Sequence, residues 1–306
     1  MNGRRGIAQL LVLWALLLLG TLAAGFALSM RAEAQAARNG IDGLRAYYQA
    51  RSGVSRAMML LSTLPAESLS RGIRIEGEEE DAAYLVEIVG EGGKININSV
   101  QEDDLLEILE RGGLQDEKAE SVRDAILDWR DGDDDPRPFG AESAEYARLR
   151  EPLVPRNGNL ASVEELRYVI GVTQEFYGRF LSRVFTVYGS ASRMEVNVSE
   201  ASGIVLGSLP GVSPEAVEEI QAKQSEGVKF SSAVLADMAS RGLLTQKGLS
   251  ALSIRAFSQV YEITSTGQAG RGALHTVRCL ASVEGRGRKS VKILRWVDLA
   301  ARGEEY

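Results

Sequence analysis

The residues with the clearest potential for chemistry form an acidic cluster near the middle of the chain. Five aspartates fall within the eight residues 128–135, and Glu142 follows shortly after. Packed together without a cation, these carboxylates would repel one another, and some would have raised pKa values. A hard cation with oxygen ligands relieves this repulsion, so the cluster predicts a structural calcium site. The candidate ligands are Asp128, Asp131, Asp133, Asp134, Asp135 and Glu142.

The spacing within the cluster favours calcium over other ions. Asp131, Asp133 and Asp135 take positions one, three and five of an EF-hand-like loop, and Glu142 takes position twelve. Pro136 stands at position six, where an EF-hand has glycine, so the ligand geometry is expected to differ from that of a standard EF-hand. Magnesium is a weaker alternative because it prefers fewer protein ligands and more water.

Two of these carboxylates have an alternative role. Asp128 lies on the helix side of the loop, where it could cap the helix or pair with Arg130 or Arg137 instead. Asp134 is equally ambiguous, since neighbouring carboxylates often point away from each other. The whole segment could also be a solvated acidic loop that holds no ion. If calcium binds, we expect it to support stability and not turnover.

The scarcity of side chains suited to catalysis argues against an enzyme. Cys279 is the only cysteine and His275 the only histidine, so neither an intrachain disulfide nor a zinc site of the usual ligand set can be assembled. No nucleophile elbow is present to complete a histidine-based triad. A metal-dependent hydrolase at the acidic cluster would lack a histidine ligand and a nucleophile. We therefore expect a structural protein.

Charge also argues against nucleic acid as a partner. The 306 residues carry a formal net charge of −7. Residues 209–220, LPGVSPEAVEEI, resemble a helix-hairpin-helix, whose DNA-binding versions hold a phosphate through hairpin N–H groups. Here Ser213 replaces the second hairpin glycine, and Glu215, Glu218 and Glu219 surround the turn, so we favour a packing role. The alternative function, a membrane-anchored DNA receptor for DNA uptake, would require duplex binding that weakens steeply with salt.

The elements that must position the acidic cluster form a long helical stretch, about 95–252, with a weak internal repeat. Each copy begins with an Asn- and Ser-rich segment, 95–99 or 196–199, whose side chains can cap the following helix. A short turn and a second helix come next, which points to antiparallel helix pairs. The expected helices are 103–111 and 116–129 in the first copy, and one ending near Leu209 followed by 214–223 in the second.

Strand patterns flank the helical stretch on both sides. Two strands are expected within 73–89, joined by an acidic turn at 76–81. Alternating apolar and polar residues predict three antiparallel strands after the helical stretch, in a sheet with one face exposed to water. These strands are expected over 257–264, 274–283 and 290–297.

The N-terminal segment is apolar enough to cross a membrane. Residues 7–28 include only two polar side chains, Gln9 and Thr21, and meet the length that a membrane-spanning helix needs. Arg4 and Arg5 precede this run, so we expect the N-terminus in the cytoplasm and the body outside.

A helical apolar pattern continues beyond the membrane segment. It predicts one continuous helix over about 7–61, with its first half in lipid and its amphipathic second half on a soluble body. A cleaved secretory signal peptide is the alternative, since residues 32–34 resemble a cleavage site. The apolar run is longer than such a signal normally has, which favours the membrane anchor.

These features together resemble a known family. A short basic leader ending in Gly6, followed by Ile7 and a long apolar helix, looks like a type IV prepilin signal. Most pilins carry Glu at the fifth mature position, where this chain has Leu11. The missing Glu, the acidic segment 128–142 and the segment 160–173 resemble the K-type minor pseudopilins of type II secretion.

The resemblance implies a fold and a division of the chain. The fold would be α+β, with a long N-terminal helix packed on an antiparallel pilin-like sheet and a large inserted all-helical domain that binds calcium. The implied parts are a leader (1–6), the transmembrane half of the helix (7–28), its amphipathic half with the first strands (29–92), the inserted domain with helix-hairpin-helix-like repeats (93–252) and the C-terminal strands (253–306).

The resemblance also implies how the protein is processed, where it is located and with which proteins it assembles. A prepilin peptidase would cut between Gly6 and Ile7, and the methylated mature helix would anchor the chain once in the bacterial inner membrane, with the body in the periplasm. Leu11 suggests a tip position, because a subunit with no neighbour above gains nothing from the Glu. There the chain would start pseudopilus assembly with I- and J-type minor pseudopilins, above the H- and G-type pseudopilins, for export of folded proteins across the outer membrane.

Overall fold

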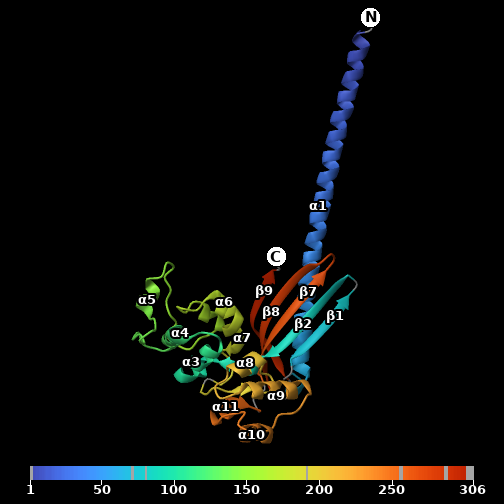
Figure 1. Cartoon of the computed structure of the whole chain (residues 1–306). Coiled ribbons are helices and arrows are strands. Elements are labelled where there is room, and N and C mark those ends of the chain that lie inside the picture. Colours follow the sequence, from blue (N-terminus) through green and yellow to red (C-terminus); the bar gives the residue numbers. More distant parts are fainter. Residues whose placement is uncertain are drawn as a thin grey trace.

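The computed structural model describes residues 3–69, 72–79, 81–190, 192–254, 258–285 and 289–300. A long N-terminal helix stands beside an antiparallel sheet, and a helical region lies at one end of that sheet (Figure 1). The first half of the long helix projects away from the rest of the molecule. The predicted fold class, α+β with a long helix on an antiparallel sheet and a large helical insertion, is confirmed.

The long helix, α1 (Gly3–Thr63), has two different halves. Large apolar side chains are exposed throughout residues 10–28, whereas Ala46 and Ala50, one helical turn apart, are fully buried. A Cβ atom on Gly267 of the sheet would lie 2.0 Å from the Ala46 carbonyl oxygen. Small residues on both sides therefore let the helix backbone lie directly on the sheet. Within the described residues, α1 is the one helix long and apolar enough to cross a membrane, which is consistent with a single membrane anchor.

The sheet combines two strands that precede the helical region with three that follow it. The strands are β1 (Ile73–Glu79), β2 (Ala82–Gly90), β7 (Val260–Ala269), β8 (Ala273–Glu284) and β9 (Ser290–Ala300). Their order is β1-β2-β7-β8-β9, and all neighbours are antiparallel. Since β2 pairs directly with β7, the chain leaves the sheet at Gly90 and returns at Val260. The helical region is therefore inserted between two adjacent strands. A short helix, α2 (Ala66–Leu69), connects α1 to β1.

Two short parallel strand pairs divide the helical region. The pairs are β3 (Ile95–Asn96) with β4 (Phe185–Thr186), and β5 (Val196–Asn197) with β6 (Leu252–Ser253). We call residues 95–186 the first unit and residues 196–253 the second unit. Each unit thus opens and closes with strands that pair with each other, and one continuous apolar core runs through both units.

Each unit begins with a pair of helices close to those predicted. These are α3 (Glu102–Arg111) and α4 (Asp116–Arg130) in the first unit, and α8 (Gly203–Ser208) and α9 (Pro214–Ser225) in the second. The first unit continues with α5 (Ser143–Ala147), the 3-10 helix η3 (Val163–Arg167) and a run of α6 (Gln174–Phe176), η4 (Tyr177–Leu181) and α7 (Ser182–Val184). The second unit continues with α10 (Ser232–Ser240) and α11 (Gln246–Ala251).

The Asn-rich opening segments cap different elements from those expected. The Asn96 side chain accepts a hydrogen bond from Asn98 N at 3.0 Å, and so caps the one-turn 3-10 helix η2 (Ile97–Ser99). The residue before α3, Gln101, makes no side-chain cap. A second 3-10 turn, η1 (Glu91–Gly93), links β2 to this segment. The expectation that the Asn side chains cap the following α-helices was wrong. In the first unit, η2 lies between Asn96 and α3.

Candidate metal centre

Helix α4 carries a row of carboxylates toward its C-terminal end. Asp124, Asp128 and Asp131 follow one another at helical spacing, which puts them along one face. Asp124 and Asp128 are fully buried, and Asp131 is partly buried at the residue that caps the helix. Buried carboxylates need donors or cations, so this face must be satisfied by the segment that covers it.

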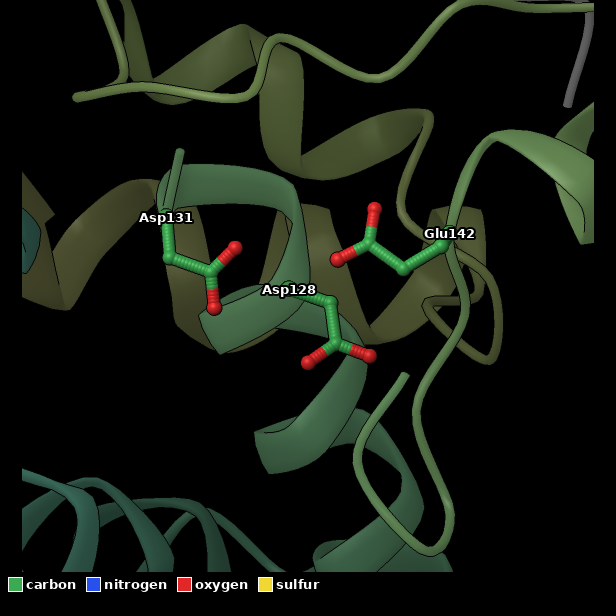
Figure 2. A group of neighbouring side chains, drawn as sticks. All are labelled: Asp128, Asp131 and Glu142. Carbon is green, nitrogen blue, oxygen red and sulfur yellow. The ribbon is translucent and has the colours of Figure 1, made fainter. Parts of the chain in front are cut away.

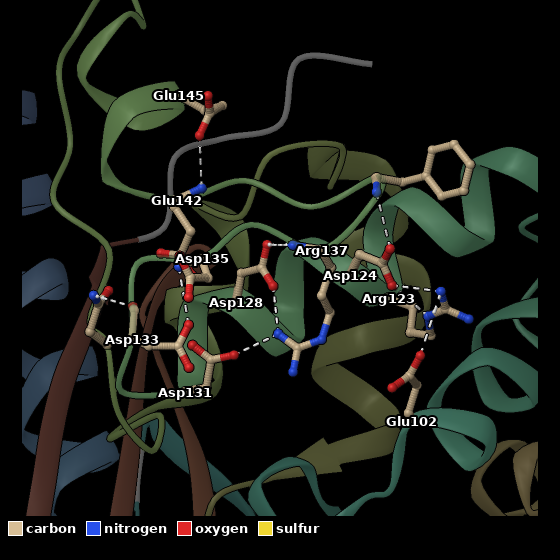
Figure 3. A network of polar contacts seen from close by, with 12 residues as sticks. Glu102, Arg123, Asp124, Asp128, Asp131, Asp133, Asp135, Arg137, Glu142 and Glu145 are labelled. Carbon is tan, nitrogen blue, oxygen red and sulfur yellow. Dashed lines mark hydrogen bonds and ion pairs between the residues drawn. The ribbon is translucent and has the colours of Figure 1, made fainter.

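That segment is the loop after α4, residues 131–142, which folds back along the same helix (Figure 3). Its backbone N–H groups bond to the row of carboxylates, with Phe139 N donating to Asp124 Oδ2 and Arg137 N donating to Asp128 Oδ2, both at 3.2 Å. Gly140 passes so close that a Cβ atom there would lie 1.9 Å from Asp128 Oδ2. The row of carboxylates therefore fixes the path of the loop.

Arg137 supplies the cation inside this arrangement. Its Nη1 atom donates to Asp128 Oδ1 and to Asp131 Oδ2, each at 2.5 Å. Burial raises the pKa of Asp128, although the bonds from Arg137 act in the opposite direction. One guanidinium thus bridges two of the candidate ligands, which is one of the alternatives that the sequence left open for Asp128. Arg130, the other possible partner, instead donates to the Ile97 and Val100 carbonyls.

Glu142 arrives from the opposite end of the loop and has no such partner. Its side chain is 1% exposed and stands at the capping-box position before α5, but neither carboxylate oxygen accepts a hydrogen bond of ordinary geometry. Burial, together with the negative charges of Asp128 and Asp131, raises the pKa of Glu142 to about 7. The backbone fixes its position, because Glu142 N donates to Glu145 Oε2 at 3.1 Å. A buried carboxylate without a donor is costly and calls for a positive partner.

Three of the six predicted ligands come together in space. Asp128, Asp131 and Glu142 offer carboxylate oxygens that all lie within 4.8 Å of one another, as Figure 2 shows for the last turn of α4 and the residue before α5. Asp131 Oδ1 and both Glu142 oxygens are buried without a hydrogen-bond partner. Clustered oxygen ligands of this kind suit a hard cation such as calcium, which takes its remaining ligands from backbone carbonyls and water. The residues therefore fit the predicted ion.

The other three predicted ligands lie outside this group. Asp133 and Asp135 are exposed, and Asp133 Oδ1 accepts a local hydrogen bond from Asp135 N at 3.1 Å. Asp134 is also exposed, and its Oδ1 accepts from Ser143 N at 3.4 Å. The structure thus brings positions one and twelve of the EF-hand-like pattern together, Asp131 and Glu142, but not positions three and five, because the Asp133 side chain turns back on its own loop. Asp133 and Asp134 remain near enough to raise the pKa of Glu142 through their charge.

Asp124 is a further buried carboxylate that holds the loop on α4, and the sequence analysis did not single it out. It accepts from Phe139 N and from Arg123, whose guanidinium lies 2.6 Å from Asp124 Oδ1 and 3.8 Å from Glu102 (Figure 3). The signal was present in the spacing, because Asp124 lies one helical turn before Asp128 on the same helix.

The hairpin that resembles a DNA-binding motif makes backbone hydrogen bonds within the second unit. Ser213 N donates to the Leu243 carbonyl at 3.1 Å, and Val212 N donates to the Leu209 carbonyl at 3.3 Å. The same turn accepts a bond from Thr245 N at Gly211 O. Phosphate recognition through these two N–H groups would require breaking bonds within the second unit. Packing is the better account of this hairpin.

Comparisons with known proteins find that part of the chain is similar to one family. Residues 85–189, which include the whole first unit, match the family model described as type II secretion system (T2SS), protein K. The type II secretion system protein K of Pectobacterium carotovorum subsp. carotovorum is 32% identical over 90 residues, which are 29% of this chain and 27% of that protein. The protein of the same name from Klebsiella pneumoniae is 26% identical over 246 residues, which are 73% of this chain and 75% of that protein.

A solved structure has the same fold. It is the crystal structure of the GspK–GspI–GspJ complex from the type 2 secretion system of enterotoxigenic Escherichia coli, with a TM-score of 0.61 and 14% sequence identity. The match covers 87% of this chain and 99% of that one, so most of this chain shares the architecture of that structure.

Proposed function

We propose that this chain is a minor pseudopilin of the protein K family of type II secretion systems, whose family model residues 85–189 match, and that it forms the tip of the pseudopilus. In this role it starts assembly with I- and J-type minor pseudopilins, above the H- and G-type pseudopilins, for export of folded proteins across the outer membrane. The observation that carries the proposal is α1, which joins an exposed apolar half to a half packed on the body.

The exposed half of α1 acts as the membrane anchor and later as the assembly helix. Its most apolar stretch has a mean hydropathy of 2.3, and none of that stretch is buried. Arg4 and Arg5 at its start favour a cytoplasmic N-terminus in the inner membrane, with the body in the periplasm. Cleavage by a prepilin peptidase between Gly6 and Ile7, followed by methylation, leaves this helix as the mature N-terminus.

Leu11 supports a position at the tip. Its side chain is 65% exposed on α1, so it meets lipid or a neighbouring subunit. A carboxylate at this depth is costly in lipid unless another subunit provides a partner. A tip subunit has no neighbour above to provide one. The solved relative in fold was crystallised as GspK with GspI and GspJ, which supports I- and J-type partners for this chain.

A secretion assay with Leu11 variants tests the tip position. Leu11→Glu is expected to leave secretion unchanged or lower it, because the added carboxylate finds no partner. Leu11→Ala is the matched control for loss of the side chain, and it should support secretion close to the parent level. An increase in secretion with Leu11→Glu would contradict the tip position, because it would mean that a subunit above provides a partner.

We also propose that one calcium ion at Asp128, Asp131 and Glu142 stabilises the first unit. The two unpartnered oxygens of buried Glu142 support this role. When bound, the ion supplies only positive charge, while the three side chains hold it and keep the loop on α4. Chelation should lower the thermal stability of the parent chain and leave that of Glu142→Gln nearly unchanged. Glu175→Gln is the control, since Glu175 is exposed on α6 of the same unit and is not one of the three clustered carboxylates. A parent chain insensitive to chelation would overturn this proposal.

A further inference from the structure

The Arg137 guanidinium already performs part of the task of a metal ion. It contacts Asp128 and Asp131 through the same nitrogen, each over 2.5 Å, while its own side chain is only partly buried at 32% exposure. Charge-assisted bonds of this kind are stronger than neutral hydrogen bonds. Arg137 therefore links the helix side of the site to the loop without any ion.

Arg137 nevertheless leaves the site incomplete. The three clustered carboxylates carry three negative charges when ionised, and the one guanidinium that contacts them, through Asp128 and Asp131, compensates only one of these charges. Asp131 gives one oxygen to Arg137 and keeps Oδ1 free, and Glu142 keeps both of its oxygens free. One divalent ion supplies the missing charge and uses the free oxygens.

We propose that Arg137 is the resident cation of this site. A single calcium ion binds the same two carboxylates that Arg137 contacts, Asp128 and Asp131. Arg137 holds the loop in place when the ion is absent and weakens the binding of the ion when it is present. The inference rests on the proposed calcium site and adds its regulation. Two cations on shared carboxylates repel each other, so each lowers the affinity of the site for the other.

The proposal makes the two cations partly interchangeable. Without calcium, Arg137 alone opposes the repulsion among the carboxylates, so its loss is costly. With calcium bound, the ion supplies that attraction, and loss of Arg137 costs less. Because binding and folding are linked, a variant that loses less stability in the bound state must bind the ion more tightly. An arginine that only pins the loop would instead cost the same stability in both states.

Calorimetric titration of the full chain in detergent with calcium chloride tests the proposal. The parent chain should bind one calcium ion. Arg137→Gln should also bind one and should gain about tenfold in affinity, which corresponds to about 1.4 kcal/mol. Its melting temperature should fall clearly in chelator and recover in saturating calcium. Arg137→Lys keeps the charge and should stay within about threefold of the parent affinity, since a threefold change is well below 1 kcal/mol.

Arg123→Gln is the matched control for loss of a nearby arginine. Arg123 bonds to Asp124, which holds the same loop through Phe139 N but is not one of the three clustered carboxylates. This variant should lose stability equally with and without calcium and keep the parent affinity.

The outcomes separate this inference from the calcium site itself. Equal or weaker calcium binding by Arg137→Gln, with binding by the parent intact, would overturn the inference and leave the site standing. Binding by Arg137→Gln alone would support Arg137 as the resident cation and overturn the calcium role of the natural chain. Absence of binding in both would overturn both.

Discussion

The two helical units close in the same way but differ in what lies between their helices. In the first unit, residues 131–161 separate α4 from the segment that leads into η3, whereas residues 226–231 suffice between α9 and α10 in the second. All members of the acidic cluster after Asp128 lie in the longer connection. Among the described residues, the second unit has no comparable group of clustered carboxylates. In the first unit, a long polar loop is held on α4 by charge.

The ends of the two units support this comparison. Thr173 caps α6, with Phe176 N donating to its Oγ1 at 3.1 Å, and Thr245 caps α11, with Gly248 N donating to its Oγ1 at 3.3 Å. Helix α11 runs directly into the closing strand β6, and α6 continues through η4 and α7 into the closing strand β4. The shared framework is therefore built from caps and apolar packing, and the acidic loop is an addition to one copy of it.

The largest expected effect comes from removing the central carboxylate of the first unit. Asp128→Ala leaves Arg137 without one of its partners and frees the loop at Arg137 N. Breaking a buried ion pair costs about 3 kcal/mol, so we expect a loss of this size in the free energy of unfolding by denaturant. Lys223→Ala, three residues before the cap of α9, should cost less than about 0.5 kcal/mol, because its pair with Glu219 is near the surface. Equal losses would contradict the difference between the units.

The pH dependence of calcium-free protein gives the next largest effect. The pKa of Glu142 in the folded chain is about 7, raised mainly by burial from an ordinary 4.5. The folded state therefore binds this proton more tightly than the unfolded state. The resulting stability is full below the ordinary pKa and is lost as the pH rises through about 7. The parent chain should lose about 3 kcal/mol more than Glu142→Gln over this range. Parallel curves of stability against pH would contradict the burial of an unpaired Glu142.

A tight backbone approach gives a comparable effect without changing any charge. Gly140→Ala places a methyl group against Asp128 Oδ2, so the loop must shift, at an expected cost of about 1–3 kcal/mol. Gly132→Ala lies in the same loop, where a Cβ atom would meet nothing within 4 Å, and should be nearly neutral. Both effects can be read from thermal unfolding. A neutral Gly140→Ala would show that the loop is not held against α4.

The smallest effect tests what the two units have in common. Thr173→Ala and Thr245→Ala each remove one side-chain cap, which typically costs about 1 kcal/mol. We expect similar losses for both variants in chemical denaturation, with and without calcium. A loss at Thr173 that depends on calcium would mean that the ion supports the shared framework of the first unit and not only its loop.

The large elements could be predicted from the sequence because their signals are periodic. The helix expected over about 7–61 occupies 3–63, and the strands expected over 274–283 and 290–297 occupy 273–284 and 290–300. The strand expected over 257–264 begins at Val260, and its first predicted residue lies outside the described residues. A hydrophobic pattern that repeats over many residues predicts an element well even where single residues depart from the pattern, which explains this agreement.

The candidate site could be predicted only in part. The cluster and three of its members, Asp128, Asp131 and Glu142, were identified from charge and spacing. The sequence did not predict which of the six candidate carboxylates come together, because the EF-hand spacing applies only to a loop that turns as an EF-hand loop does. Here the loop runs back along α4, and Arg137 meets carboxylates that are six and nine residues away in the chain. Such long-range contacts depend on the path of the loop, which local spacing does not encode.

The measurement that tests the central claim most directly is co-purification of the full-length chain from membranes with I- and J-type minor pseudopilins. A tip subunit of the protein K family should be recovered with both partners in one stable complex. Leu11→Ala should be recovered to the same extent, because the proposed contacts do not need a charged group at this position. If the I- and J-type proteins pair with each other but exclude this chain, the proposed tip role is contradicted.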